Sequence, residues 1–180
     1  MNRIDETREF VPVRIAVLTV SDTRTLADDT SGEVLVERLL DAGHVLAARG
    51  IVTDDRGAIV ARLRQWCADP AVDVILTTGG TGLTGRDVTV EAHREVYEKE
   101  IEAFGTVFAM VSLGKIGTSA VQSRACGGVA RGKYLFALPG SPGACRDGWD
   151  EILKGQLDYR HKPCNFVEIM PRLEEHKRRK

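Results

Sequence analysis

VDVILTTGGTGLTGRDVT, residues 72–89, is the stretch around which the rest of the chain is organised. It opens with Val72–Leu76, a mostly apolar run of the length and branching typical of a buried strand. The run breaks into residues 77–82, TTGGTG, where glycine permits positive φ and close approach of a ligand to the main chain. Successive backbone N–H groups in such a turn form a concave anion site. We interpret the stretch as a strand followed by a phosphate-binding loop; a turn that needs glycine for steric reasons is the alternative.

Two familiar phosphate-binding loops do not fit this stretch. Gly80 and Gly85 have the glycine spacing of a Walker loop, but Arg86-Asp87 stand where that loop needs Lys followed by Ser or Thr. The dinucleotide-binding fingerprint requires a third glycine and follows the first strand of its domain. The sequence therefore predicts a glycine-rich loop of another kind, with the carboxylate of Asp87 able to hold a hydrated metal ion.

The composition is that of an ordinary globular protein. The chain has 180 residues, enough for one domain with a full-sized core, and 43% of them are hydrophobic. A formal net charge of −1 argues against a nucleic-acid-binding or membrane-binding surface. We count no apolar run near the roughly 18 residues of a membrane-spanning helix, and the first ten residues lack the apolar segment of a secretory signal.

The cysteines are scattered, without C-x-x-C spacing or a nearby histidine, which speaks against a metal site. Free thiols in a reducing cytosol are the interpretation we adopt, so we expect a cytoplasmic protein with no nucleic-acid and no membrane partner. The four cysteines are Cys67, Cys126, Cys145 and Cys164.

The hydrophobic pattern predicts alternating strands and helices between a flexible N-terminal arm, residues 1–12, and a charged C-terminal tail, residues 167–180. Buried strands are expected at residues 14–20, 72–76 and 133–138, and a weaker strand, interrupted by Arg49 and Gly50, at residues 45–52. Helices are expected from a Thr30–Glu33 capping box to Ala42-Gly43, over residues 59–68, from Thr89 through Lys99, over residues 104–113, and from Ser141-Pro142 onward.

This alternation predicts an α/β domain over residues 13–166, with a mostly parallel sheet and helices on its faces. Polar or glycine-rich groups follow each strand, at Ser21-Asp22, Asp54-Asp55, Gly79–Asp87 and Pro139–Gly143. Because parallel strands bring their carboxyl ends to one edge of the sheet, we expect these groups to form a single ligand site. Residues 104–113 are apolar nearly all round, which predicts burial within the domain or, as we favour, a subunit contact.

The chain resembles the MoaB/MogA family of molybdenum cofactor biosynthesis proteins over about residues 13–166, and is closer to the MoaB branch. The segments that carry the resemblance are TVSD (19–22), DDTSG (28–32), TTGGTGLTGRDVT (77–89), GTSAVQSR (117–124), ALPGSPG (137–143) and RHKPCNF (160–166). The resemblance implies a three-layer α/β/α domain that assembles into trimers or hexamers. It also implies adenylylation of molybdopterin by Mg-ATP with release of pyrophosphate.

The two acids important in this family match Asp54 and Asp87. The resemblance therefore implies that they are catalytic and that they hold Mg²⁺, an ion usually bound by one or two carboxylates and substrate phosphates. Helix capping is the alternative for Asp54, and a turn role is the alternative for Asp87. Asp55 is expected to be a cap. Thr53 departs from the proline common in the MogA branch, which we expect to be harmless.

Further residues are expected to bind substrate. Gly79, Gly80, Thr81 and Gly82 would bind phosphate through backbone N–H groups. Ser21 and Asp22 are candidates for the nucleotide or the pterin, and Ser119 and Ser123 for the pterin, with helix capping as the alternative for both serines. Pro139, Gly140 and Ser141 lie at a helix start, a ready anion site.

Three functions remain open on the sequence alone. The first is a molybdopterin adenylyltransferase, with ATP and molybdopterin as substrates. The second is a catalytically silent molybdopterin-binding or scaffold protein of the same pathway, and the third is an unrelated nucleotide-binding module. In the first two, the expected partners are other copies of the chain and other molybdenum cofactor biosynthesis enzymes.

Overall fold

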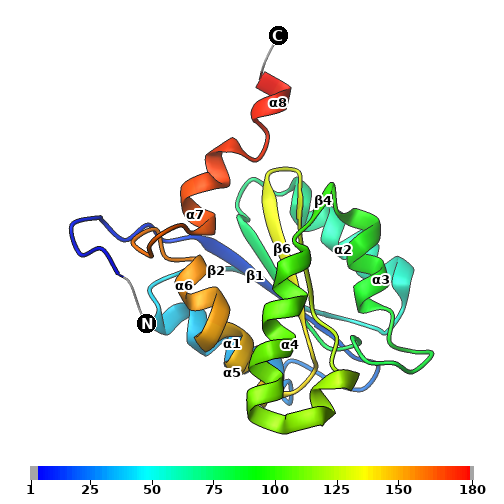
Figure 1. Cartoon of the computed structure of the whole chain (residues 1–180). Helices are drawn as coiled ribbons and strands as arrows, with labels where there is room; N and C mark the ends of the chain where they lie inside the picture. The colour runs from blue at the N-terminus through cyan, green and yellow to red at the C-terminus, as the bar shows by residue number, and fades with distance from the viewer. Residues whose placement is uncertain (1–3, 179–180) are drawn as a thin grey trace.

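A six-stranded mixed sheet, in the order β2-β1-β3-β6-β5-β4, forms the centre of the computed structural model, which describes residues 4–178 (Figure 1). The first four strands in this order run parallel to one another, and β5 and β4 run antiparallel to their neighbours. The strands are β1 (Arg14–Val20), β2 (Val45–Val52), β3 (Val74–Thr78), β4 (Lys99–Glu100), β5 (Cys126–Ala130) and β6 (Lys133–Leu138).

Helices cover both faces of the sheet, as expected for three layers (Figure 1). One face carries α1 (Thr30–Asp41), α4 (Glu102–Ile116), α5 (Pro142–Gly148) with its continuation η2 (Trp149–Leu153) and α6 (Lys154–Gln156), and α7 (Phe166–Ile169). The other face carries α2 (Arg56–Ala68) and α3 (Thr89–Val96). The short elements η1 (Gly117–Gln122), η3 (Met170–Arg172) and α8 (Glu175–Arg178) complete the described chain.

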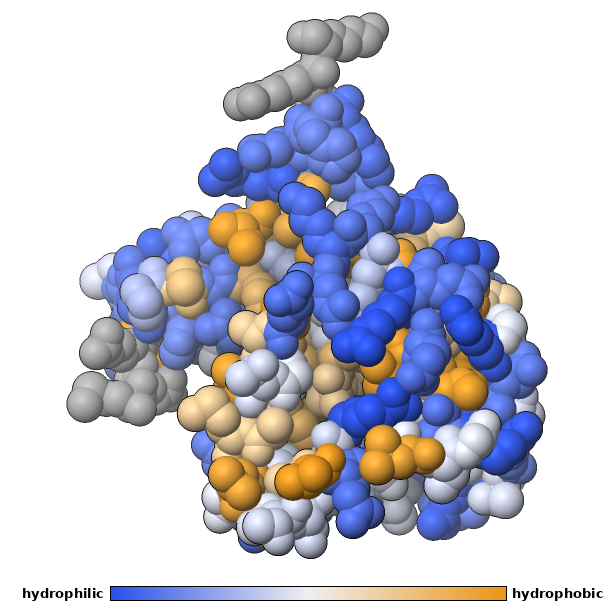
Figure 2. Space-filling model, turned by 45° about the vertical axis from the view of Figure 1, so that its right-hand side comes forward, coloured by the Kyte–Doolittle hydropathy of each residue, from blue (hydrophilic) through white to orange (hydrophobic). Residues whose placement is uncertain are grey.

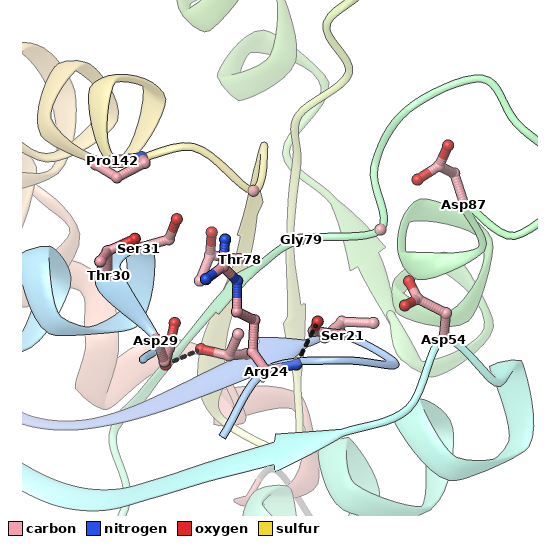
Figure 3. Close-up of a pocket in the computed structure, with 14 residues that line it drawn as sticks. Ser21, Arg24, Asp29, Thr30, Ser31, Asp54, Thr78, Gly79, Asp87 and Pro142 are labelled. Carbon is pink, nitrogen blue, oxygen red and sulfur yellow. Dashed lines mark hydrogen bonds between the residues drawn. The ribbon is translucent and has the colours of Figure 1, made fainter. Parts of the chain in front are cut away.

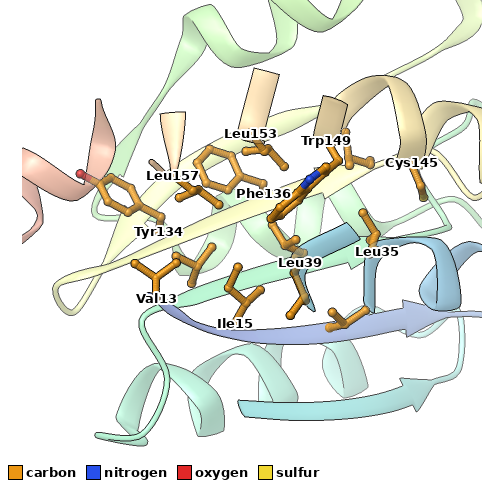
Figure 4. Packing of buried hydrophobic residues seen from close by; sticks show 14 of the residues in the cluster. Val13, Ile15, Leu35, Leu39, Tyr134, Phe136, Cys145, Trp149, Leu153 and Leu157 are labelled. Carbon is orange, nitrogen blue, oxygen red and sulfur yellow. The ribbon is translucent and has the colours of Figure 1, made fainter. Parts of the chain in front are cut away.

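Alternation along the central strands explains the two cores. In β1, Ile15 and Val17 face the layer of α1 and α5, while Ala16 and Leu18 face α2. Figure 4 shows the first of these cores, in which Trp149 lies among leucines of α1 and η2. Because successive side chains of a strand point to opposite faces, a continuous apolar run is what a strand buried on both faces requires.

The register confirms that the strands end together. Thr19 of β1 pairs with Thr78 of β3, and Thr78 pairs in turn with Leu138 of β6. The loops that follow these strands therefore start from one edge of the sheet, where the polar and glycine-rich groups were expected to meet.

Two predicted helix caps are wrong. The N-cap of α1 is Asp29, whose carboxylate accepts from the Gly32 N–H at 2.9 Å, and Thr30 is the first helical residue. Thr89 does not cap α3 either, because its hydroxyl donates to the Gly79 carbonyl at 2.8 Å. At α1 the cap lies one residue earlier than predicted, whereas at α3 a contact with the glycine-rich loop, which local sequence does not reveal, takes the Thr89 hydroxyl.

Two strands, β4 and β5, were not predicted. The sequence of β5, CGGVA, has small residues because helix α3 and its C-cap lie close against it. A Cβ at Gly128 would lie 2.4 Å from the Tyr97 ring. The helix expected to reach Lys99 ends at Val96, and the chain then forms β4 beside β5.

The described parts of the two terminal segments contact the domain. The Asp5 N–H donates to the Arg160 carbonyl at 2.9 Å, and the Arg8 guanidinium lies 4.9 Å from the centre of the Tyr159 ring. In the tail, Leu173 packs against the core of the α1 face. Residues 1–3 of the expected arm and 179–180 of the expected tail lie outside the described residues.

The helix expected over residues 104–113 exists as α4, but its apolar surface is only partly covered. Phe104 and Phe108 are buried on the sheet, while Met110 is 69% and Leu113 55% exposed. Residues 102–122 are long and apolar enough, by length and composition alone, to cross a membrane, with a mean hydropathy of 1.3 over a window that is 22% buried. Our count of uninterrupted apolar residues missed this stretch, because glycine, serine and lysine interrupt it.

Candidate functional site

A cavity of about 320 Å³ opens where the parallel strands end, and side chains from five segments line it (Figure 3). The segments are the ends of β1, β2 and β3 with their loops, the first turn of α1, and the turn between β6 and α5. The lining residues are Thr19, Val20, Ser21, Arg24, Asp29, Thr30, Ser31, Asp54, Thr78, Gly79, Gly80, Asp87, Gly140 and Pro142.

The glycine-rich loop adopts the left-handed backbone that its composition suggested. Gly79 has φ +98° and Gly80 has φ +64°. A Cβ at Gly79 would lie 2.3 Å from the Val20 carbonyl oxygen, so no side chain fits there. The Gly79 N–H donates to the Leu138 carbonyl at 3.2 Å and is therefore already engaged. The steric need for glycine thus holds at Gly79, and a phosphate would have to use other N–H groups of the loop.

Asp87 closes the loop and also faces the cavity. Its Oδ2 accepts from the Thr84 N–H at 2.9 Å and from the Thr84 hydroxyl at 2.7 Å. These hydrogen bonds, with the Thr84 hydroxyl first, lower the pKa of the Asp87 carboxyl, so the group stays ionised well into the acid range. Oδ1 has no hydrogen bond among the described residues. Asp87 therefore serves the turn through one oxygen and leaves the other for a ligand.

Asp54 reaches the same loop from the end of β2. A Cβ at Gly80 would lie 2.9 Å from the Asp54 Oδ1, so the carboxylate approaches the glycine main chain closely. Partial burial, followed by the nearby negative charge of Asp22, raises the pKa of the Asp54 carboxyl. Asp55 is the N-cap of α2, as expected, and accepts from the Ala58 N–H at 2.7 Å. Capping therefore does not account for Asp54.

Asp22 holds two of the loops that line the cavity without lining it itself. Its Oδ1 accepts from the Asp54 N–H at 3.0 Å, and its Oδ2 accepts from the Arg86 guanidinium at 2.6 Å. The hydrogen bond from Arg86 lowers the pKa of the Asp22 carboxyl. Asp22 does not line the cavity, and its side chain joins the β1 loop to the β2 and glycine-rich loops.

Arg124, which follows η1, holds the glycine-rich loop from the other side. Its Nε donates to the Thr81 carbonyl at 2.8 Å and to the Gly82 carbonyl at 3.1 Å. Its Nη1 forms an ion pair with Glu91 of α3 at 2.5 Å. In the sequence, Arg124 stands out only as part of the segment GTSAVQSR, and no pattern within that segment indicates a contact with residues about 40 positions earlier.

The cavity gathers some of the predicted site residues and leaves out others. Those that line it are Ser21, Asp54, Gly79, Gly80, Asp87 and Gly140. Those that do not are Asp22, Thr81, Gly82, Ser119, Ser123, Pro139 and Ser141. Ser141 is instead the N-cap of α5, accepting from the Ala144 N–H at 3.1 Å, as the Ser-Pro pair predicted.

Sequence reasoning missed the end of the cavity formed by the β1–α1 loop. Arg24, Asp29, Thr30 and Ser31 line it there, and in Figure 3 Arg24 extends between Ser31 on one side and Asp54 on the other. The signals available were the segment DDTSG at residues 28–32, which carries part of the family resemblance, and the Thr30–Glu33 pattern, which predicts a helix start. Hydroxyl-rich helix starts serve as caps and as anion sites alike, and the sequence does not separate the two.

The donor set fits a magnesium ion that also binds substrate oxygens. Among the described residues there is no group of three or more metal-ligating side chains. Three carboxylates line the cavity: Asp29 is paired with Arg49, whereas Asp54 and Asp87 form no ion pair within residues 4–178. Mg²⁺ is commonly held by one or two carboxylates together with phosphates and water, so this pair suits it.

Comparison with known proteins gives a consistent result. Residues 16–159 match the family described as "Probable molybdopterin binding domain". Molybdenum cofactor biosynthesis protein B of Escherichia coli (strain K12) is 49% identical over 158 residues, covering 88% of this chain and 93% of that protein. A crystal structure of Molybdenum cofactor biosynthesis protein B has TM-score 0.84 at 38% identity, covering 93% of this chain and 99% of that one. The tungsten cofactor synthesizing protein MoaB from Pyrococcus furiosus has TM-score 0.71 at 30% identity, with coverage of 93% and 98%.

Proposed function

The chain belongs to the MoaB/Mog family of molybdenum cofactor biosynthesis proteins, and from that premise we propose that it adenylylates molybdopterin with Mg-ATP and releases pyrophosphate. Its place in molybdenum cofactor biosynthesis and its binding of molybdopterin follow from the family. The adenylyl transfer, the magnesium ion and the assignment of residues are the proposal.

The single observation that carries the proposal is the meeting of Asp54 and Asp87 against the glycine-rich loop in one cavity. The two residues come from different strand ends, 33 positions apart in the sequence. In the proposed reaction they hold Mg²⁺, which would neutralise phosphate charge and align the reacting groups. The N–H groups of Gly80 and its neighbours are the proposed phosphate donors.

The chemistry needs no proton to be removed. An oxygen of the pterin's terminal phosphate forms a bond to the α-phosphorus of ATP, and the bond from that phosphorus to the α,β-bridging oxygen breaks. Pyrophosphate leaves with the electron pair. A phosphate monoester is already mostly ionised at pH 7, so the cavity requires charge neutralisation and alignment more than a general base. The absence of histidine from the cavity lining agrees with this.

We further propose that the protein acts as a homo-oligomer, a trimer or a hexamer, in the cytoplasm, where it would deliver its product to later molybdenum cofactor biosynthesis enzymes. Support for self-association comes from the exposed apolar side of α4 and η1 (Figure 2). The space-filling view shows tan and orange residues running down to the lower edge of the molecule, where Figure 1 has these elements. We define this α4 face as Val107, Met110, Leu113, Ile116 and Val121.

The direct test is to incubate the full chain with molybdopterin, Mg²⁺ and ATP and to measure adenylylated pterin and pyrophosphate. We expect product from the wild type and at least a 100-fold slower rate from Asp87→Asn and Asp54→Asn. Both substitutions keep side-chain size and hydrogen bonding while they remove the charge that holds the cation. Pterin binding without ATP-dependent product would contradict the proposal and favour the silent binding or scaffold protein. Binding of ATP without binding of pterin would favour a separate nucleotide-binding module.

Arg64→Gln is a matched control for these variants. Arg64 lies on the outer side of α2, where it pairs with Glu95 at 3.4 Å, away from the cavity lining. Its substitution also removes one charge, of the opposite sign, at a place away from the cavity, and should leave the rate unchanged.

A further inference from the structure

The β1–α1 end of the cavity contains polar groups that the proposed metal and glycine-loop roles do not use. Ser31 is only 8% exposed, and its hydroxyl has no hydrogen bond among the described residues. In Figure 3 the Ser31 side chain lies in the cavity between the start of α1 and Pro142. The hydroxyl borders the cavity and keeps its hydrogen-bonding capacity, so a ligand in the cavity can bind to it.

Arg24 adds a positive charge to the same end. Its side chain is 54% exposed, and its protein contacts are long: Nη1 is 3.4 Å from the Asp28 carbonyl and 3.8 Å from the Asp28 carboxylate. Nε and Nη2 have no acceptor among the described residues. The backbone N–H of Arg24 donates to the Ser21 hydroxyl at 3.1 Å, which ties the base of this side chain to the end of β1. The guanidinium thus contacts Asp28 through Nη1 only, and its Nε–H and Nη2–H groups are available to a ligand.

Helix α1 also presents its N-terminus here. Its N-cap, Asp29, uses its carboxylate on the Gly32 N–H at 2.9 Å and the Thr19 hydroxyl at 2.6 Å, and Arg49 pairs with it at 3.5 Å. The charge of Asp29 is therefore compensated within the protein. The Ser31 N–H has no acceptor among the described residues, so this N–H, the Ser31 hydroxyl and the Arg24 guanidinium are available at one end of the cavity.

We propose that Arg24, Ser31 and the first turn of α1 form a subsite for a phosphate monoester dianion, separate from the carboxylate end of the cavity. A guanidinium fork, a hydroxyl and a helix N-terminus together recognise such an anion without a metal ion. This inference rests on the proposed function for its substrate: the anion is the acceptor phosphate of the pterin, while the nucleotide triphosphate lies with the metal ion at Asp54 and Asp87. A magnesium-free subsite at one end and two carboxylates at the other would distinguish the two phosphorylated substrates.

The first test uses inorganic phosphate as the probe, titrated into the full chain without Mg²⁺, ATP or pterin. Binding is measured by calorimetry, and the site is located by amide shifts in ¹H–¹⁵N spectra. We expect the Ser31 amide to shift, Arg24→Gln to weaken phosphate binding about tenfold or more, and Ser31→Ala to weaken it several-fold. Arg24→Lys keeps the positive charge but loses the paired N–H donors of the guanidinium, so its phosphate affinity should lie between those of the wild type and Arg24→Gln. Arg64→Gln is the charge-matched control and should bind phosphate as the wild type does.

Two results of this titration would overturn the subsite. One is phosphate binding to Arg24→Gln that equals that of the wild type. The other is amide shifts confined to the glycine-rich loop, with Asp87→Asn rather than Arg24→Gln changing the affinity. Because the spectra of the wild type alone locate the ligand, the test stands even if a variant fails to fold.

The second test separates the subsite from the reaction itself. In the adenylylation assay, Arg24→Gln should raise the KM for molybdopterin about tenfold and leave the KM for ATP within twofold. A rise in the KM for ATP alone would overturn the assignment to the pterin phosphate. If the wild type forms no product, the proposed function fails, whereas the phosphate titration still decides whether the subsite exists.

Discussion

Arg124 donates its Nε–H to the main-chain carbonyl of Thr81 at 2.8 Å, so a residue that follows η1 holds the glycine-rich loop 43 positions earlier in the chain. The same guanidinium pairs with Glu91 of α3. The loop thus depends on a tertiary contact as well as on its glycines.

The first prediction concerns this contact. Arg124→Gln should lower kcat/KM about 10- to 100-fold, because the loop carbonyls lose charge-assisted hydrogen bonds worth about 1.5–3 kcal/mol each. Steady-state kinetics at 25 °C, where the variant is checked to be folded by circular dichroism, measure the effect. Glu91→Gln removes the ion pair but leaves the hydrogen bonds to the loop, so its loss should be smaller. Equal losses in the two variants would contradict a positioning role for Arg124.

Replacing two glycines of the same loop with alanine should affect the stability of the protein very differently. Gly79→Ala should destabilise the protein by about 1–3 kcal/mol, because φ is +98° and the new Cβ would meet the Val20 carbonyl oxygen. Gly85→Ala should change stability by no more than about 0.5 kcal/mol, since no heavy atom lies within 4 Å of its Cβ position. Urea denaturation measures both. Equal stability of the two variants would contradict the left-handed conformation at Gly79.

Stability should fall in mild acid because of His93. Its ring is fully buried, with Nε2 2.9 Å from the Thr77 hydroxyl oxygen and Nδ1 3.0 Å from the Tyr97 hydroxyl oxygen, and burial lowers its pKa to about 3. Between this pKa and the ordinary histidine value of 6.5, the unfolded chain binds the proton and the folded chain does not. The free energy of unfolding should therefore decrease as the pH drops below 6.5, by up to about 1.4 kcal/mol per pH unit from this group.

Urea denaturation between pH 5 and pH 8 measures this slope. His44 adds to it, since burial lowers its pKa to about 4. His93→Gln should thus reduce the slope rather than abolish it. A slope that stays the same in His93→Gln would show that His93 is not held neutral.

The α4 face, defined above, should mediate self-association. Replacing Met110 and Leu113, 69% and 55% exposed, with glutamate should shift the protein toward the monomer in sedimentation velocity, because charges would then have to be buried in the contact. Leu40→Glu on α1, also half exposed, is the control and should not change the assembly. An unchanged sedimentation coefficient in the double variant would place the subunit contact elsewhere.

Much of the fold follows from local sequence. The strands at residues 14–20, 45–52 and 133–138 have the predicted bounds. For residues 14–20 and 133–138 the reason is that a continuous apolar run suits a strand covered on both faces. Ser141-Pro142 starts α5 as predicted, since a cap and its first helical residue are neighbours in the chain. By contrast, β5 was missed because its glycines are needed for packing against residues distant in sequence, Gly128 against Tyr97 and Gly127 against Phe104.

The sequence by itself determined the α/β class, the glycine-rich loop, and the placement of Asp54 and Asp87 after strands, since these depend on residue type and on neighbours along the chain. Only the tertiary structure decided which residues support these groups. Asp22 accepts from the Asp54 N–H, Arg124 donates to the glycine-rich loop, and Arg24 and Ser31 line the β1–α1 end of the cavity. The physical reason is that strand pairing sets which loops meet, whereas side-chain hydrogen bonds between those loops depend on distances that no local pattern encodes.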